Sequence, residues 1–129
     1  MFDRSLVLEQ IAGAEEAIRR IERRFQGITA PDDFVSSDEG LDRLDAIAMM
    51  LIAVGESIKK IDKITRGKLL EVFPEIHWPG VKGTRDILAH DYFGIDQEEI
   101  YNICVNDLVP LKRALLKMRE DVTRLAPAI

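Results

Sequence analysis

Apolar residues recur at alternating spacings of four and three along this 129-residue chain, and this period is its strongest constraint on folding. Between Val7 and Phe25 the apolar positions are separated by charged residues, as in an amphipathic helix. Gly27 follows the last of them and can end the helix in the left-handed conformation. The opening segment is therefore predicted to be a long helix with one buried face.

A second apolar stripe runs from Leu41 to Ile61 and is wider than the first. It predicts a central helix that packs on more than one side. Ser36 and Glu39 have the spacing of a capping box, so this helix is expected to start at Ser36. Residues 29–35, which include Pro31, are predicted to form the loop before it.

The second half of the chain predicts shorter elements and then one long helix. Residues 66–72 are expected to form a short helix, 74–83 an irregular segment with two Pro and two Gly, and 81–89 another short helix. Asp96 with Glu99 should cap the last helix, which continues to Leu125. Pro110 lacks an amide donor and crowds the carbonyl of residue 106, so a kink is expected there.

These patterns predict an all-α fold. Three long helices and one or two short ones can bury their stripes most simply as an up-and-down helical bundle. Residues 1–129 are long enough for one domain with one core, and too short for two comfortable domains. The regular spacing in the first and last helices could also serve a partner helix, although core packing is the simpler explanation.

Composition narrows the setting in which the chain works. No apolar run approaches the roughly 18 residues of a membrane span, and the N-terminus does not resemble a signal peptide, so we expect a cytoplasmic protein that contacts no membrane. The single cysteine, Cys104, is expected to be a small buried apolar residue. A formal charge of -5 means that any nucleic acid must be bound by a local basic patch.

One such patch can be found near the middle of the chain. The patch consists of Lys59, Lys60, Lys63, Arg66 and Lys68, interrupted only by Asp62, at the end of the central stripe. Lys82 lies close to the motif described next. Lysine side chains gathered in this way can contact phosphates. The alternative is a solvated helix end, which composition alone favours.

The richest chemistry lies between Arg85 and Tyr92. A guanidinium provides fork-shaped donors that match a phosphate, and an imidazole can transfer a proton near neutral pH. Arg85, Asp86 and His90 are therefore candidate catalytic residues for phosphodiester chemistry. The alternative is structural, with Arg85 paired to a neighbouring aspartate and His90 capping a helix end.

Helix geometry limits what one copy of this motif can do. Residues five apart on a regular helix are separated by about 140° around its axis. Either the helix ends before His90, which lets the imidazole turn toward Arg85, or two chains bring their motifs together across a two-fold axis. The second arrangement is preferred, and it predicts a homodimer.

The rest of the chain offers no competing chemistry. His77 has no partner at a metal-ligand spacing and is expected to be a loop residue beside Trp78, a buried anchor. The sequence holds no zinc motif, glycine-rich phosphate loop or nucleophile elbow. We therefore expect no metal and no cofactor.

The run Arg85-x-x-x-x-His90-x-Tyr92 resembles the signature of the HepT-like branch of HEPN proteins. Gly55 to Lys60 is similar to the family's Gly-Glu helix segment, and Pro74 to Arg85 is similar to its loop into the motif. With the helix pattern, the resemblance covers nearly the whole chain. It implies a HEPN-like helical bundle and a metal-independent endoribonuclease, the toxin of a type VII (HepT/MntA-like) toxin–antitoxin system.

The resemblance also implies roles for single residues. His90 would act as general acid or base while the RNA 2′-hydroxyl attacks the adjacent phosphate, and Arg85 would stabilise the developing charge, in a cleft shared by two chains. Tyr92 would be adenylylated by a MntA-like nucleotidyltransferase antitoxin, and each added AMP would obstruct the cleft. This chain has Asp86 where the family often has Asn, which places negative charge beside the substrate. A non-catalytic helical module that binds a nucleotidyltransferase is the alternative.

Overall fold

The computed structural model describes residues 2–125 and, among them, every side chain except that of Tyr92. Its α-helices are α1 (Arg4–Phe25), α2 (Asp38–Thr65), α3 (Trp78–His90), α4 (Gln97–Asn102) and α5 (Leu108–Arg124). Single 3-10 turns lie at η1 (Pro31–Phe34), η2 (Leu70–Val72) and η3 (Tyr92–Gly94), and a π-helical segment, η4 (Ile103–Asp107), joins α4 to α5. No β-strand occurs in residues 2–125. The predicted all-α fold, with three long helices and two short ones, is confirmed.

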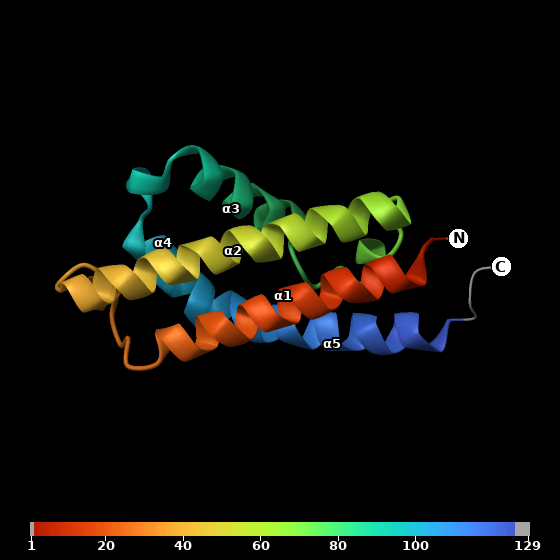
Figure 1. Cartoon of the computed structure of the whole chain (residues 1–129), viewed down its shortest axis with the longest axis horizontal. Coiled ribbons are helices and arrows are strands. Elements are labelled where there is room, and N and C mark those ends of the chain that lie inside the picture. The colour runs from red at the N-terminus through yellow and green to blue at the C-terminus, as the bar shows by residue number, and fades with distance from the viewer. Residues whose placement is uncertain (1, 126–129) are drawn as a thin grey trace.

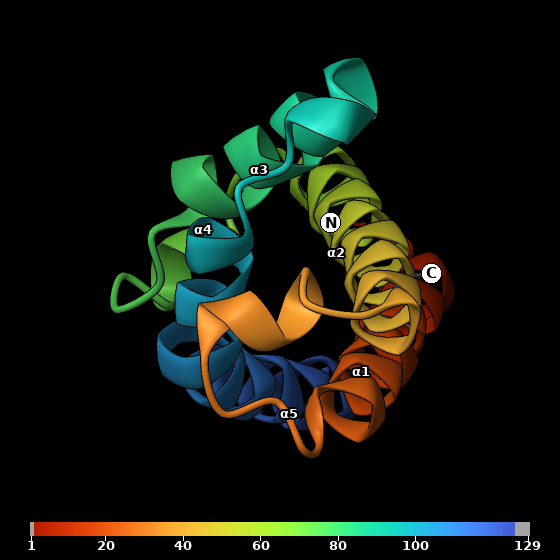
Figure 2. The same ribbon diagram turned by 90° about the vertical axis from the view of Figure 1, so that its left-hand side faces the viewer.

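The helices form an up-and-down bundle, as predicted. Helix α2 runs antiparallel to α1, α3 returns along α2, and the α4–α5 arm runs back, so that the start of α1 and the end of α5 share one end of the bundle (Figure 1). Along the bundle axis the helices surround a common centre (Figure 2). Helix α1 packs against α2 and α5, whereas α3 packs against α2. Helix α3 therefore lies at the outside of the bundle and packs mainly against α2.

Helix α1 forms as its sequence predicts. The Asp3 carboxylate accepts a hydrogen bond from the Leu6 amide at the helix start. The apolar face is buried from Val7 to Ile21, and Gly27 has a φ of 85°, which a glycine adopts without strain. Helix α1 thus supplies one wall of the core.

The entry to α2 differs from the prediction in two ways. The capping residue is Ser37 and not Ser36, because the Ser37 hydroxyl accepts from the Gly40 amide at 3.0 Å. Residues 31–34 form a 3-10 turn and not an irregular loop, since Asp33 accepts from two preceding amides and Phe34 is fully buried. The segment is therefore part of the core and fixes the direction in which α2 begins.

The structure differs most from the prediction in the segment between α2 and α3. Residues 66–72 form only a 3-10 turn at Leu70–Val72, and α3 begins at Trp78, inside the stretch expected to be irregular. Pro79 is compatible with this start because the first turn of a helix does not use its amide donors. The predicted anchor is confirmed: Trp78 is buried, and its indole donates to the Leu70 and Phe73 carbonyls at 3.0 Å each.

The last helix is interrupted where Pro110 was expected to distort it. The Asp96 carboxylate accepts from the Glu98 amide and caps α4, and the π-helical turn at residues 103–107 precedes α5. This turn includes residue 106, whose carbonyl a proline at position 110 would crowd in a regular helix, so it accommodates the proline without separating the two helices. The arm from α4 to α5 is therefore continuous but irregular.

One packing prediction in this arm is confirmed. Cys104 is buried, and burial raises the pKa of its thiol to about 12. Tyr101 packs against Phe25 and donates its hydroxyl hydrogen to the Thr29 carbonyl at 2.9 Å. Across residues 2–125, no helix is long and apolar enough to cross a membrane.

Candidate active site

The position of Arg85 is set by a close crossing of α2 and α3 at Gly55. A methyl group at position 55 would overlap with Cβ of Arg85 and lie 2.9 Å from its Cγ. Only glycine lets the two helices approach this closely. The Arg85 side chain therefore leaves α3 directly over α2, and 29% of it remains exposed.

Carboxylates on both helices surround the Arg85 guanidinium. Nη1 donates to Oδ1 of Asp86 at 3.1 Å, and Nε forms an ion pair with Oε1 of Glu56, although without the geometry of a hydrogen bond. Lys59 of α2 donates to the same Asp86 oxygen at 2.5 Å. Two cations and two carboxylates thus form a nearly neutral, partly exposed cluster at the α2–α3 seam.

Asp86 is the centre of this cluster. The ammonium of Lys59, and then the guanidinium of Arg85, hold the pKa of Asp86 below its usual value by hydrogen bonding to the charged form. The carboxylate is therefore ionised wherever the cluster is intact. The predicted pairing of Arg85 with a neighbouring aspartate is observed, and the residue is accessible at the same time.

His90 is the last residue of α3 and is exposed. Since the helix runs through His90, it does not end early enough to turn the imidazole toward Arg85. Five helical positions leave the two side chains about 140° apart around the axis of one chain. One chain therefore presents the two groups in the second half of α3, on different sides of the helix.

Two of the four predicted lysines lie at the same seam, and the other two are exposed on α2. Lys59 is paired with Asp86, and Lys82 of α3 is paired with Asp62 of α2 at 2.8 Å. Lys60 and Lys63 are exposed on α2. The basic patch is thus partly neutralised by the protein itself.

Tyr92 follows α3 in the turn η3. Its side chain lies outside the described residues, so its predicted modification is not tested by its surroundings. The neighbouring Asp91 carboxylate accepts from the Gly94 amide, which fixes the backbone of the turn.

The structure adds a residue that sequence reasoning did not select. The sequence pattern indicates Glu56 only as part of a Gly-Glu segment, whereas in the structure it contacts Arg85 directly. The signal was the adjacent Gly55, because a glycine inside a long helix often marks the close approach of another helix. His77 is exposed at the start of α3, beside Trp78. No group of three or more His, Cys, Asp or Glu that could hold a metal ion occurs within residues 2–125.

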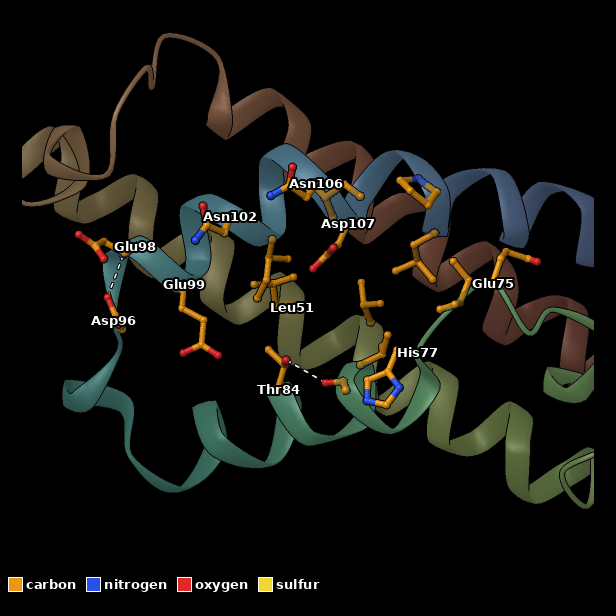
Figure 3. A pocket seen from close by; sticks show the side chains of 18 residues that line it. Leu51, Glu75, His77, Thr84, Asp96, Glu98, Glu99, Asn102, Asn106 and Asp107 are labelled. Atoms are coloured by element: carbon orange, nitrogen blue, oxygen red, sulfur yellow. Dashed lines mark hydrogen bonds between the residues drawn. The ribbon is translucent and has the colours of Figure 1, made fainter.

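A second feature not predicted from the sequence is a groove of about 720 Å³ between α3 and the α4–α5 arm. Figure 3 shows side chains from both walls pointing into it, among them Thr84 of α3 and Glu99 of α4. Thr84 precedes Arg85 in the sequence, so the two side chains leave α3 in different directions. The groove and the charged cluster therefore lie on different sides of the same helix.

The all-α bundle and the helix that carries Arg85 and His90 define a class of protein, a helical bundle with side chains suited to chemistry on phosphates. Comparisons with known proteins indicate the same class. A family model described as "Ribonuclease HepT-like" matches residues 14–118. The chain therefore belongs to the HepT-like ribonuclease family.

Individual relatives are distant but consistent with this family. "Probable ribonuclease HepT" of Thermococcus cleftensis is 29% identical over 113 residues, or 88% of this chain and 93% of its own length. "Putative RNase TTE0752" of Caldanaerobacter subterraneus is 31% identical over 90 residues, 70% of this chain and 73% of that one. "Putative RNase MJ1216" of Methanocaldococcus jannaschii is 31% identical over 77 residues, 60% of each chain.

This chain spans less than two thirds of the length of three Methanocaldococcus jannaschii relatives, between 46% and 63%. No solved structure matches it significantly.

Proposed function

We propose that this chain is a metal-independent endoribonuclease in which Arg85 and His90 act on one RNA phosphate. The observation that carries this proposal is the accessible placement of both groups on α3, in a chain of the HepT-like ribonuclease family. Lys60 and Lys63 extend the positive surface along α2 and can contact neighbouring phosphates.

The reaction needs no group beyond these side chains. The RNA 2′-hydroxyl attacks the adjacent phosphorus while an imidazole removes its proton, and the 5′-oxygen of the next nucleotide leaves with a proton from a second imidazole. The products are a 2′,3′-cyclic phosphate and a 5′-hydroxyl end. Arg85 stabilises the charge that builds on the non-bridging oxygens.

A homodimer supplies the pair of imidazoles that this scheme uses. One α3 separates Arg85 and His90 by about 140°, so two helices related by a two-fold axis are needed to direct both groups at one phosphate. Exposed apolar side chains suit such a contact: Ile87 is 62% exposed on α3 and Met49 is 55% exposed on α2. We place the dimer interface across this part of the α2–α3 surface.

Substrate must compete with the carboxylates of the resting site. An RNA phosphate reaches the Arg85 guanidinium only by weakening its contacts with Asp86 and Glu56. RNA must therefore bind tightly enough to displace these carboxylates from Arg85 before it is cleaved. The arrangement also favours the alternative function, a non-catalytic helical module that binds a nucleotidyltransferase, because the cluster is electrostatically balanced without substrate.

We further propose that the protein is the toxin of a type VII toxin–antitoxin system in the cytoplasm and is neutralised by a MntA-like nucleotidyltransferase. Tyr92 is the acceptor of the AMP group. It lies two residues after His90, so each added phosphate would place negative charge at the entrance to the cleft and repel RNA.

Cleavage of RNA in the presence of a chelator tests the enzymatic proposal. Purified wild-type protein should cut, and His90→Ala should lose at least 100-fold in rate, the usual scale for a general acid or base. His77→Ala is the matched control, because His77 is also exposed but lies at the opposite end of α3 and outside the motif. Equal rates for the His90→Ala and His77→Ala variants would remove His90 from the mechanism. Inert wild-type protein on several RNA classes would favour the binding module.

A mixing experiment tests the shared cleft. A fixed amount of wild-type protein mixed with an excess of His90→Ala protein should lose most of its activity when heterodimers form, because each shared cleft then lacks one of the two imidazoles that the reaction uses. If each chain acted alone, the activity of the wild-type chains would be unchanged. Size-exclusion chromatography with light scattering establishes that heterodimers form.

Intact-mass spectrometry tests the modification. Incubation with the partner nucleotidyltransferase and ATP should add AMP units to the wild type and to Tyr101→Phe, the control whose hydroxyl bonds Thr29, but not to Tyr92→Phe. AMP on the Tyr92→Phe protein would exclude this residue as the acceptor.

A further inference from the structure

The groove between α3 and the α4–α5 arm has an apolar floor. Leu51 and Val54 of α2 lie at its base, and Leu108 and Leu111 of α5 contribute to one wall. Its volume of about 720 Å³ falls in the range of pockets that hold several side chains or a small molecule. Apolar surface of this kind gains free energy when a partner covers it.

The rim of the groove is strongly acidic. Glu98 and Asp96 lie toward one end, Glu75 toward the other, and Glu99 and Asp107 between them (Figure 3). No lysine or arginine lines the groove, and none of the five carboxylates forms an ion pair with any described residue. By contrast, Glu15 and Glu22 are paired with cations of α5. The groove therefore concentrates negative charge that the protein does not compensate.

We propose that this groove binds a basic amphipathic segment of a partner protein. The segment would place apolar side chains on the floor and lysine or arginine side chains against the carboxylates of the rim. Charge complementarity of this kind accelerates association and selects against acidic competitors. RNA is excluded as an occupant because five carboxylates repel its phosphates.

A small polycation such as a polyamine fits the observations less well. It would neutralise the rim but leave the leucine and valine floor in contact with water. The carboxylates also extend from Glu75 to Glu98, from one end of the groove to the other, as an elongated peptide requires (Figure 3). The proposal is independent of ribonuclease activity, since the groove does not include Arg85 or His90.

Fluorescence anisotropy with a defined probe tests the proposal. The probe is a labelled peptide of about 14 residues with leucine and lysine at helical spacing. The groove variant Glu98→Gln/Glu99→Gln/Asp107→Asn should bind it about tenfold more weakly than the wild type. The control variant Glu9→Gln/Asp42→Asn/Asp45→Asn removes the same charge from exposed positions on α1 and α2 and should change the Kd less than twofold.

The remaining outcomes decide against the proposal. Equal weakening in the two triple variants would mean attraction by net charge alone. Displacement of the peptide by spermidine at equal charge concentration would mean a polyamine site, and failure of the wild type to bind would leave no docking surface. A peptide with serine in place of leucine should bind at least tenfold more weakly; equal binding would exclude the apolar floor.

Hydrogen exchange on the wild-type protein provides a readout that needs no variant. Peptide binding should slow exchange of amides in residues 96–111 more than in residues 38–50, which lie away from the groove. Uniform slowing would contradict the proposed location. Arg85→Ala should bind the peptide with unchanged affinity whether or not the protein cleaves RNA.

Discussion

Replacement of Gly55 by alanine tests the helix crossing that positions Arg85. A methyl group there would overlap with Cβ of Arg85, which is fixed to the α3 backbone and cannot rotate away. Helices α2 and α3 must therefore move apart. Overpacking of this kind costs about 1–3 kcal/mol, and overlap with a backbone-attached atom places it toward the upper end.

Two other glycines separate this cost from the general effect of alanine in a helix. Gly83 of α3 has open space around the position of a Cβ, and Gly13 of α1 has only Ser57 Oγ at 3.7 Å. Alanine at either position should stabilise the protein by about 0.8–1 kcal/mol through helix propensity. Alanine gains the same helix propensity at position 55. The difference in unfolding free energy between Gly55→Ala and Gly83→Ala therefore measures the overlap alone, about 2–3 kcal/mol.

Thermal unfolding followed by circular dichroism measures this difference. An unfolding entropy of about 2.1 cal/mol/K per residue gives about 0.27 kcal/mol per kelvin for a chain of this length. The Tm of Gly55→Ala should therefore lie about 7–11 °C below that of Gly83→Ala. Equal Tm values for these two variants would refute the close crossing, and with it the reason that Arg85 leaves α3 over α2.

Other perturbations test separate parts of the structure. Trp78→Phe removes the donor to two buried carbonyls and should lower the free energy of unfolding in urea by about 1–3 kcal/mol; no loss would mean that the indole hydrogen bonds are not formed. Asp86→Asn removes one negative charge beside Arg85, so RNA should bind more tightly. The slope of log Kd plotted against log salt concentration should become steeper by about 0.7, and an unchanged slope would mean that RNA binds elsewhere. Arg19 and Arg20 hold the pKa of Glu16 at about 2, below the ordinary 4.5, so its stabilising contribution is complete above pH 4.5 and disappears as pH falls through about 2. The difference in unfolding free energy between wild type and Glu16→Gln should shrink over that range, and a constant difference would contradict the pairing.

Periodicity alone was sufficient to predict the bundle, for a physical reason. Each long helix buries one stripe against its neighbours, so the spacing of Val7, Ile11 and Ala14 reports directly on the core. The sequence pattern does not predict the start of α3, because two prolines and two glycines suggest a loop. The contacts of Trp78 determine where the helix begins. The indole is buried and hydrogen-bonded across the preceding turn, which starts the helix with Pro79 in its first turn and despite Gly80. Tertiary contact overrides local propensity there.

The candidate site was predictable in its residues but not in its contacts. Arg85, Asp86 and His90 follow from a local motif, whereas Glu56 lies 29 positions before Arg85 and meets it only through the close crossing at Gly55. The acidic groove has the same origin. Its rim comes from residues 75, 96–99 and 107, which no sequence pattern connects and which only the return of the α4–α5 arm along α3 brings together.

The continuity of α3 through His90 strengthens the argument for a shared cleft. The Asp91 amide donates to the Ile87 carbonyl at 3.0 Å, so the last turn is closed and His90 is held in it. Turning the imidazole toward Arg85 within one chain would break that turn, while Gly55 and Glu56 hold Arg85 on the α2 side. In the proposed dimer, two intact helices meeting across a symmetry axis would bring the two groups together and leave that turn closed.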